Sequence, residues 1–172
     1  MTEEEILEEL LLREESKVEL GKFCTHISDI QPARHHQVLC EKLEDIAYGN
    51  LKRLMVFMPP GHAKSTYSSV HFPAFFLGVN PEKCIIGASH TVDLAERFSR
   101  KTRNIVSGRE FYDLYGFGLA LDSRSMGSWE TERGGEYKAA GVGSGIAGRR
   151  SDVGLIDDPI RSREDAESEL VR

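Results

Sequence analysis

Residues 53 to 66 read RLMVFMPPGHAKST and combine two patterns. The first six residues are Arg53 and five apolar residues, a pattern that is typical of a strand buried on both faces of a parallel sheet. The next eight form a loop that contains proline and glycine, and the residues from 65 to 78 have the pattern of a helix. We therefore expect a strand, a loop and a helix in direct succession.

The loop has the composition of a phosphate-binding loop. In this position it would direct backbone N–H groups and a helix N-terminus at an anion, while Lys64 adds a cation and Ser65 a hydroxyl for Mg²⁺. It departs from the general GxxxxGK[ST] pattern, because Met58 and Ala63 stand where glycines are usual. A left-handed Ala63 would cost about 1–2 kcal/mol, and Gly61 is expected to provide flexibility. The competing interpretation is a Pro-Gly turn before an ordinary helix.

The rest of the chain predicts an α/β fold. Apolar runs at 83–88 and 152–156 predict two more buried strands, and a helix is expected over 91–107. Alternating strands and helices predict right-handed crossovers and a mostly parallel sheet flanked by helices on both faces. Two short strands are expected around Ser128-Trp129-Glu130 and residues 136–139, joined by a turn at Gly134-Gly135.

The N-terminal segment differs from the rest in charge. Its first 19 residues hold eight Glu against Arg13 and Lys17, which accounts for the net charge of −6 of the 172-residue chain. Helical spacing predicts an amphipathic helix over 3–20, ended by Gly21, and a second helix over 33–48. We expect the first helix to pack on its own domain, with another subunit or a further segment as alternatives. We divide the chain into an acidic helix at 1–22 and one domain at 23–172.

Composition narrows the class of protein. No stretch approaches the roughly 18 apolar residues of a membrane-spanning helix, and the N-terminus is acidic, so we expect a soluble intracellular protein. The widely spaced Cys24, Cys40 and Cys84 are expected to be buried thiols.

The apolar run at 152–156 leads into Asp157-Asp158-Pro159. At the C-terminal edge of a parallel sheet, Asp157 would lie beside the loop and serve a Mg²⁺ ion. Asp158 stands where many ATPases have a carboxylate that orients the attacking water. The alternative is that Asp158-Pro159 only begins a turn and that Glu164 or Asp165 has this role.

Two basic segments are candidates for phosphate contacts. Residues 143–148 match GxGxxG but do not open a helix, so we interpret them as a surface loop that carries Arg149 and Arg150. A guanidinium there could reach a neighbour's nucleotide or a DNA phosphate, with a solvated loop as the alternative. Residues 97–109 hold five basic residues and no acidic ones, which favours either a DNA-facing surface or a solvated helix face. These are Arg97, Arg100, Lys101, Arg103 and Arg109.

Taken in order, these motifs resemble a known family. The set comprises residues 59–65, Gly134-Gly135, Gly148-Arg149, and residues 155–159 followed by Ala166-Glu167-Ser168. Over about residues 25 to 172 it resembles the ATPase domain of tailed-bacteriophage terminase large subunits. The resemblance implies an α/β P-loop NTPase fold of the ASCE (RecA-like) type and a motor that hydrolyses ATP with Mg²⁺ and packages double-stranded DNA. It further implies a homo-oligomeric ring in the host cytoplasm, a portal protein and a terminase small subunit as partners, and no membrane.

The resemblance also implies roles for single residues. Lys64 and Ser65 would contact phosphate and Mg²⁺, Asp157 would close the metal site, and Asp158 would be the catalytic carboxylate. Arg149 is the candidate for an arginine supplied to the next subunit, because the family's Arg-Gly pair aligns with Ala147-Gly148. Gln37 is the candidate adenine contact. The remaining nucleotide contacts would be Pro60, Gly61, His62, Ala63 and Thr66.

The chain stops at Arg172, before the family's next strands, coupling motif and nuclease domain. We therefore expect a domain truncated at its C-terminus, either a cut fragment or a shortened gene product, in which ATP binding survives better than translocation. Two alternative functions stay open: a nucleotide-binding or assembly module without catalysis, and another P-loop phosphotransferase.

Overall fold

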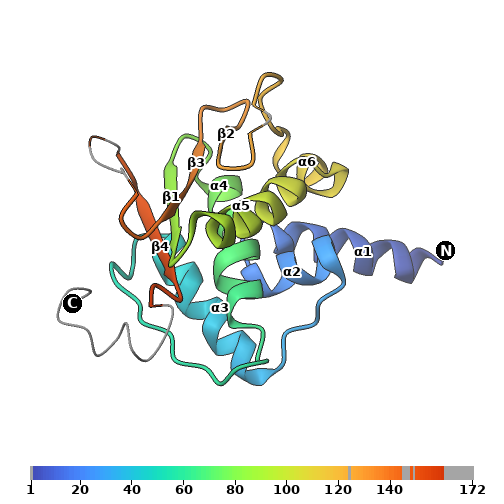
Figure 1. Ribbon diagram of the computed structural model, residues 1–172. Helices are drawn as coiled ribbons and strands as arrows, with labels where there is room; N and C mark the ends of the chain where they lie inside the picture. Colours follow the sequence, from blue (N-terminus) through green and yellow to red (C-terminus); the bar gives the residue numbers. More distant parts are fainter. Residues whose placement is uncertain (1, 124, 145–147, 149, 161–172) are drawn as a thin grey trace.

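The computed structural model describes residues 2–123, 125–144, 148 and 150–160, and shows an α/β fold with one mostly parallel sheet (Figure 1). The sheet has the order β2-β3-β1-β4. Strand β1 (Cys84–Ser89) pairs in parallel with both β3 (Glu136–Gly141) and β4 (Val153–Asp157). The short β2 (Ser128–Glu130) pairs antiparallel with β3. All four of these strands were predicted from the sequence, as was the turn at Gly134, which has a φ of 84°.

The described residues contain seven helical segments. Helices α3 (Arg34–Ala47) and α5 (Val92–Val106) confirm their predictions. The helix expected over 65–78 is present as a π-helix, η1 (Thr66–His71), continued by α4 (Phe72–Val79). Helix α6 (Arg109–Tyr115) was not predicted, and neither was α2 (Leu20–Ser28).

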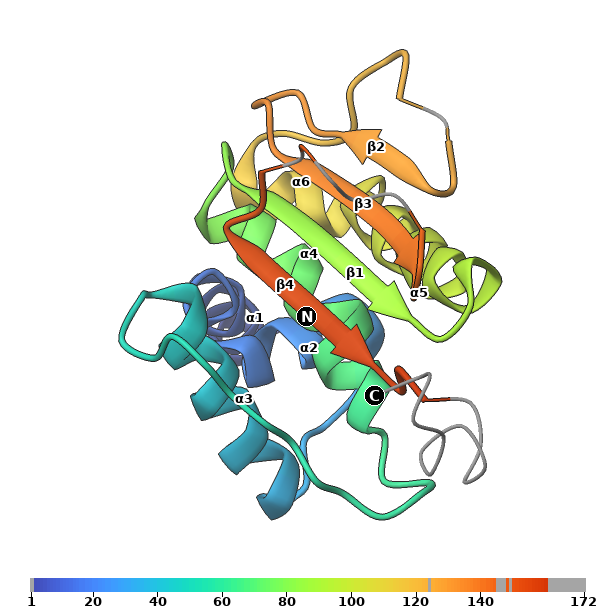
Figure 2. The same ribbon diagram turned by 60° about the vertical axis from the view of Figure 1, so that its left-hand side comes forward.

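The prediction of helices on both faces of the sheet is wrong for the described residues. Helix α5 packs on β1 and β3, and η1 and α4 lie on the same side of the sheet (Figure 2). The connection from β3 to β4 runs back past β1, opposite to the step from β1 to β3. A right-handed crossover in that direction has to cross the other face. The described part of residues 142–152 does so without a helix, and this face stays open.

The strand expected at 53–58 is also absent. The segment is extended but belongs to no sheet, and among the described residues no strand pairs with the outer edge of β4. Its burial alternates: Leu54, Val56 and Met58 pack against the core, whereas Met55 and Phe57 are 78% and 85% exposed. The apolar run therefore covers the core from one side only.

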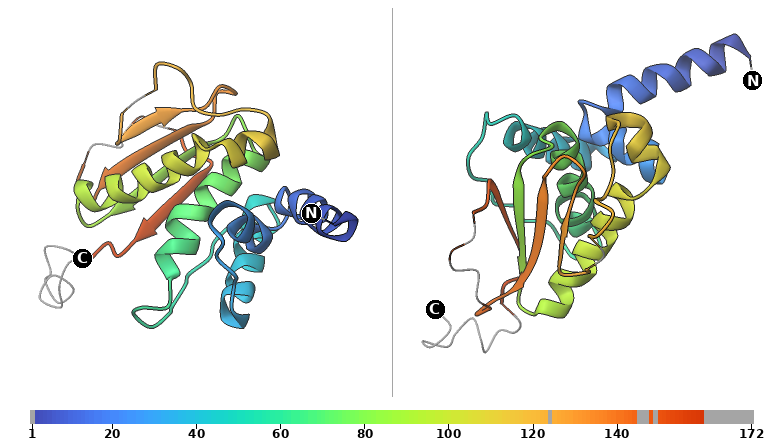
Figure 3. Two further views of the ribbon diagram at one scale, coloured as in Figure 1. Left: turned by 90° about the vertical axis from the view of Figure 1, so that its right-hand side faces the viewer. Right: turned by 90° about the horizontal axis from the view of Figure 1, so that it is seen from above.

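The N-terminal region forms two helices where one was predicted. Helix α1 (Glu3–Ser16) starts at a capping box formed by Thr2 and Glu5 and projects from the body of the protein (Figure 3). Its apolar side chains Ile6, Leu7, Leu10 and Leu11 are exposed, so the expected packing on its own domain is found only toward its C-terminal end, where Ser16 is buried and the helix contacts α2 and α6. Gly21 does not end a helix. It lies within α2, because Leu20, Phe23 and Cys24 at helical spacing are buried in the core.

The core lies between the sheet and the helices. Trp129 of β2 stacks on Tyr137 of β3 with ring centroids 5.2 Å apart, and Phe23 meets Phe75 edge to face. Cys24 and Cys40 are buried free thiols as predicted, while Cys84 is half-buried. Within the described ranges, every helix is too short or too polar to cross a membrane.

Candidate phosphate and metal site

The loop at 59–65 connects the extended segment to the start of η1, as the sequence predicts. The His62 N–H donates to the carbonyl of Pro59, at 3.4 Å, which closes a turn around Gly61 with φ 79°. Ala63 has φ 54°, so it holds the left-handed conformation that glycine adopts in the general pattern. The loop thus keeps its shape without the second glycine.

Lys64 joins this loop to the end of β4. Its Nζ lies 3.3 Å from Asp157 Oδ1 and 3.1 Å from Asp158 Oδ1, although the carboxylates are more than 90 residues away in sequence. Partial burial would lower the pKa of Lys64, but the hydrogen bond to Asp158 and the charges of both carboxylates outweigh it and raise that pKa. Lys64 is therefore charged at neutral pH and pairs with both carboxyl groups.

The two carboxylates differ in their surroundings. Asp157 is buried, and its Oδ2 accepts a hydrogen bond of 2.7 Å from Ser69 Oγ. The side chain of Asp158 is 65% exposed, and its backbone has φ 46°, a conformation that Asp tolerates better than most residues. Its carbonyl accepts from the backbone N–H of His90 at 3.3 Å and lies 3.1 Å from His90 Nδ1. Asp157 is thus fixed, while the carboxylate of Asp158 faces solvent.

The N-terminus of α3 packs against the loop at 59–65. His36 Nδ1 accepts from the Ala33 N–H, which leaves the proton on Nε2 to be donated to the carbonyl of His62, at 3.1 Å. The His36 ring stacks on Tyr67, whose phenol is buried without a hydrogen-bond partner in the described part of the chain. This burial raises the pKa of Tyr67 to about 12. His36 therefore supports the loop through its bond to the His62 carbonyl, and Tyr67 supports the ring of His36.

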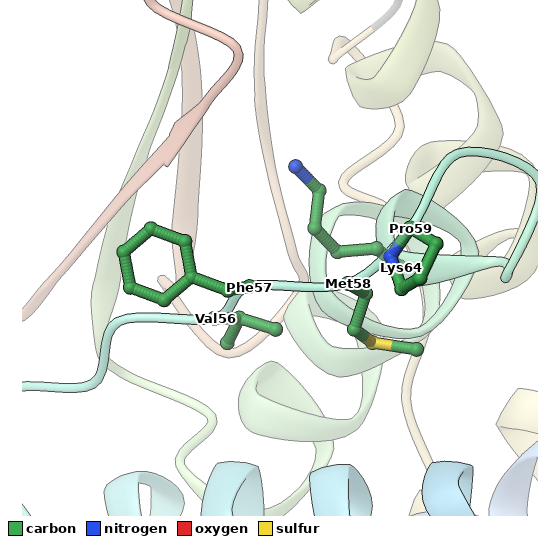
Figure 4. A pocket seen from close by; sticks show the side chains of 5 residues that line it. All are labelled: Val56, Phe57, Met58, Pro59 and Lys64. Carbon is green, nitrogen blue, oxygen red and sulfur yellow. The ribbon is translucent and has the colours of Figure 1, made fainter.

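A cavity of about 340 Å³ opens beside Lys64. It is lined by Val56, Phe57, Met58, Pro59 and Lys64 (Figure 4). The Lys64 side chain extends from the start of the helix, and Phe57 points away from Val56 and Met58. The cavity is thus lined mainly by apolar side chains, and the ammonium group of Lys64 lies at the edge of the cavity.

The structure brings part of the predicted site together. Lys64, Asp157 and Asp158 meet, and Ser65 is the first residue before η1. The carbonyl of Pro60 accepts from His62 Nδ1 at 3.1 Å, and the carbonyl of Thr66 contacts His71. Gln37 follows His36 on α3, but its amide donates to the Pro32 carbonyl at 3.4 Å and is not directed at the loop.

Several predicted residues are not part of this arrangement. Arg149, Glu164 and Asp165 lie outside the described residues. Arg150 lines a second cavity with Cys84, Ile86 and Lys138 on the open face of the sheet, away from Lys64.

Sequence reasoning missed Ser69, His90 and His36 as supports of the site. For Ser69 a signal existed: it follows Ser65 by four residues, which places both on one side of a helix. His90 and His36 act through backbone carbonyls that only the tertiary structure brings near, so no sequence pattern marks them.

The donor set fits Mg²⁺. Mg²⁺ prefers oxygen ligands and commonly takes one or two carboxylates, with substrate phosphates and water completing its shell. Asp157 and the Ser65 hydroxyl supply such oxygens. The described residues include no group of three His, Cys, Asp or Glu side chains that would hold a metal alone, so the phosphates would be needed.

Comparisons with protein-family models, curated proteins and solved structures gave no match to this chain.

Proposed function

We propose that the chain binds and hydrolyses ATP with Mg²⁺ as a P-loop NTPase, and that it is the ATPase domain of a terminase large subunit that packages double-stranded DNA. The meeting of Lys64 with Asp157 and Asp158 carries the proposal. A loop lysine facing an acidic pair at the C-terminal edge of a parallel sheet is the arrangement that phosphoryl transfer uses. The motif order described above supports the more specific assignment.

In the proposed reaction, the loop N–H groups and Lys64 bind the β- and γ-phosphates. Ser65 and Asp157 would hold Mg²⁺, which supplies positive charge at the phosphate oxygens. Water attacks the γ-phosphorus in line, the bond to the β-γ bridging oxygen breaks, and ADP and phosphate leave. Asp158 orients the water and accepts its proton.

The ion pairs with Lys64 suggest how substrate binding would activate Asp158. In the structure Lys64 is shared between both carboxylates, so a bound phosphate has to compete for the ammonium. When Lys64 moves to the phosphate, the exposed Asp158 loses its partner and becomes available to a water molecule. Binding of substrate would thus create the general base.

The proposed DNA partner is matched by the basic face of α5, which we define as Arg97, Arg100 and Lys101. These residues lie at i, i+3 and i+4 and are exposed. Arg103 is less suitable, because its guanidinium donates to the carbonyl of Ser125 at 3.1 Å. The ring, the portal protein and the small subunit belong to the same proposal.

ATP hydrolysis measured against protein concentration tests the proposal. We expect specific activity to rise with concentration and with double-stranded DNA, because an arginine supplied by a neighbour, such as Arg149, can increase the rate by about 10³–10⁵. Lys64→Ala and Arg149→Ala should remove this activity, and Lys83→Ala should retain it.

Other results would replace the proposal. ATP binding without turnover at any concentration would favour the nucleotide-binding or assembly module. Phosphate transfer to a small acceptor, without stimulation by DNA, would favour another phosphotransferase. Unchanged hydrolysis in Lys64→Ala would remove the P-loop assignment altogether.

A further inference from the structure

We propose that Ser69 is a positioning residue for Asp157, and that the π-helical turn of η1 is therefore part of the metal site. This inference rests on the proposed function, since it concerns how the carboxylate that would hold Mg²⁺ is oriented.

The contact itself is short and shielded from water. Ser69 Oγ donates to Asp157 Oδ2 at 2.7 Å, and the residues are each 6% exposed. Asp157 Oδ1 lies 3.3 Å from Lys64 Nζ. The two carboxylate oxygens of Asp157 therefore have different partners. Oδ2 accepts from the Ser69 hydroxyl, and Oδ1 faces the ammonium group of Lys64. A hydrogen bond to a buried carboxylate is stronger than one between neutral groups, so it fixes the orientation of the side chain.

The π-helical turn has a cause in the sequence. Pro73 lacks an N–H and its ring crowds the carbonyl four residues earlier, which is that of Ser69. Thr102 Oγ1 of α5 lies 3.1 Å from Val70 O, 3.5 Å from Ser69 O and 3.1 Å from Phe98 O of its own helix, so its single proton is shared among these carbonyls. The wide turn and its support from α5 hold Ser69 at the end of β4.

His71 closes the same turn from the other side. Its Nδ1 donates to the Thr66 carbonyl at 2.9 Å, and its Nε2 accepts from Ser28 Oγ at 2.9 Å. The turn is thus tied to α2 as well as to α5. Ser69 is held by tertiary contacts and does not depend on the loop for its place.

The neighbouring hydroxyls cannot replace Ser69. Ser68 Oγ donates to the Lys64 carbonyl at 2.8 Å, which uses its proton. Ser65 is the hydroxyl assigned to the metal. Ser68 is the control: it has the same side chain, adjacent in sequence, and its Oγ lies 3.4 Å from Ser69 Oγ, but its own hydrogen bond to the Lys64 carbonyl does not reach Asp157.

The test compares Ser69→Ala with Ser68→Ala. Isothermal titration would give the Kd of ATP with Mg²⁺ and with EDTA, and electron paramagnetic resonance would follow Mn²⁺ in the presence of ATP. We expect Ser69→Ala to weaken binding of ATP with Mg²⁺, and of Mn²⁺, by about 10- to 100-fold, as for other residues that orient metal ligands. Metal-free ATP should bind with unchanged affinity, and Ser68→Ala should behave as wild type.

Ser69→Cys provides a second variant of nearly the same size, whose thiol is a weak donor. If Ser69→Ala does not fold, Ser69→Cys should show the same selective loss. Equal binding in the Ser69 variants and Ser68→Ala would overturn the inference and leave the proposed function standing. An equal loss with and without metal would also overturn it, because that result indicates a packing role. A wild-type chain that binds no nucleotide would overturn the proposed function and the inference together.

Discussion

At the scale of single residues, the loop at 59–65 shows how a non-glycine residue can hold a left-handed conformation. Ala63 has φ 54° in a loop where the general pattern has glycine. The conformation is held by the turn at Gly61 before it and by η1 after it, where the Tyr67 N–H donates to the Ala63 carbonyl at 3.2 Å. The strain could be predicted from the sequence, because the pattern requires a left-handed residue at this position.

Ala63→Gly should leave stability unchanged or increase it by up to about 1.5 kcal/mol. It removes about 1–2 kcal/mol of left-handed strain and adds about 0.5–1 kcal/mol of chain entropy lost on folding. Urea unfolding measures the difference. Gly61→Ala is the matched control and should destabilise the protein, because φ is 79° there. A clear loss of stability in Ala63→Gly would mean that the loop has another conformation.

Asp158→Asn should separate nucleotide binding from hydrolysis. Asn tolerates the left-handed backbone at this position, so the loop geometry is kept while the proton acceptor is removed. We expect kcat to fall by about 10²–10⁴, whereas the Kd for ATP with Mg²⁺ should stay the same or fall, because phosphate no longer competes with a charged Asp158 for Lys64. Steady-state hydrolysis and calorimetry give the two values, with the exposed Asp122→Asn as control. A wild-type kcat would transfer the role of general base to another residue.

At the scale of elements, the sequence predicted where most helices and strands lie but not their form. The helix after the loop was expected, yet the widening of its first turn ahead of Pro73 was not. For the segment 53–58 the predicted element itself is absent. Its apolar run predicts a fully buried strand, but pairing depends on a neighbouring strand that the described residues lack. An apolar run in the sequence can predict that a segment is extended, but it does not show whether another strand lies beside that segment to pair with it.

The η1 turn should make stability depend on pH. Burial lowers the pKa of His71 below its usual value, so the unfolded chain binds a proton that the folded state excludes. Stability due to this group is then present above about pH 6.5 and decreases as the pH falls below it. Urea unfolding at pH 7.5 and pH 5 measures the change.

The variant His71→Gln should lower stability at pH 7.5 by about 1–3 kcal/mol, since the bonds to Thr66 and Ser28 are disturbed, and should flatten the change between the two pH values. His26→Gln serves as the control. If His71→Gln loses the same stability between pH 7.5 and pH 5 as the wild type, another group is responsible.

At the scale of the whole molecule, the order of the sheet determines which residues meet. Ser89 of β1 and Asp157 of β4 are neighbours in register, so the C-terminal ends of both strands lie at the edge where the loop is found. The sequence predicted that Asp157 would lie beside the loop, because the strand before it ends at the C-terminal edge of a parallel sheet, although the strand expected before the loop is absent from the described residues. The support from Ser69 and His90 could not be predicted, because it depends on the helix turn and on the conformation after β1.

The exposed side chains of α1 show a further limit of local pattern. Amphipathic spacing predicted a helix there correctly, but Leu7, Leu10 and Leu11 are each more than half exposed. Spacing indicates that a face is apolar without indicating what covers it. For α2 the same kind of spacing led to burial, because α3 and α4 lie against it.

The basic face of α5 should contribute to DNA binding if the motor assignment is right. Changing Arg100 and Lys101 to Gln should weaken binding to double-stranded DNA and reduce the slope of log K against log salt by about 1 for each DNA phosphate that is no longer neutralised. Fluorescence anisotropy over a salt series measures both. Lys22 and Lys42, changed to Gln together, remove the same charge elsewhere. An unchanged slope would show that this face does not bind DNA.

Calorimetric titration of ATP with Mg²⁺ into three proteins tests most directly whether Lys64 is the phosphate ligand, on which the proposed function depends. Lys64 pairs with Asp157 and Asp158, whereas Lys83 forms a comparable pair with Asp152, at 2.8 Å, at the opposite end of β1. We predict that Lys83→Ala binds as the wild type does and that Lys64→Ala binds at least about 100-fold more weakly. Equal affinities in all three proteins would contradict this role of Lys64.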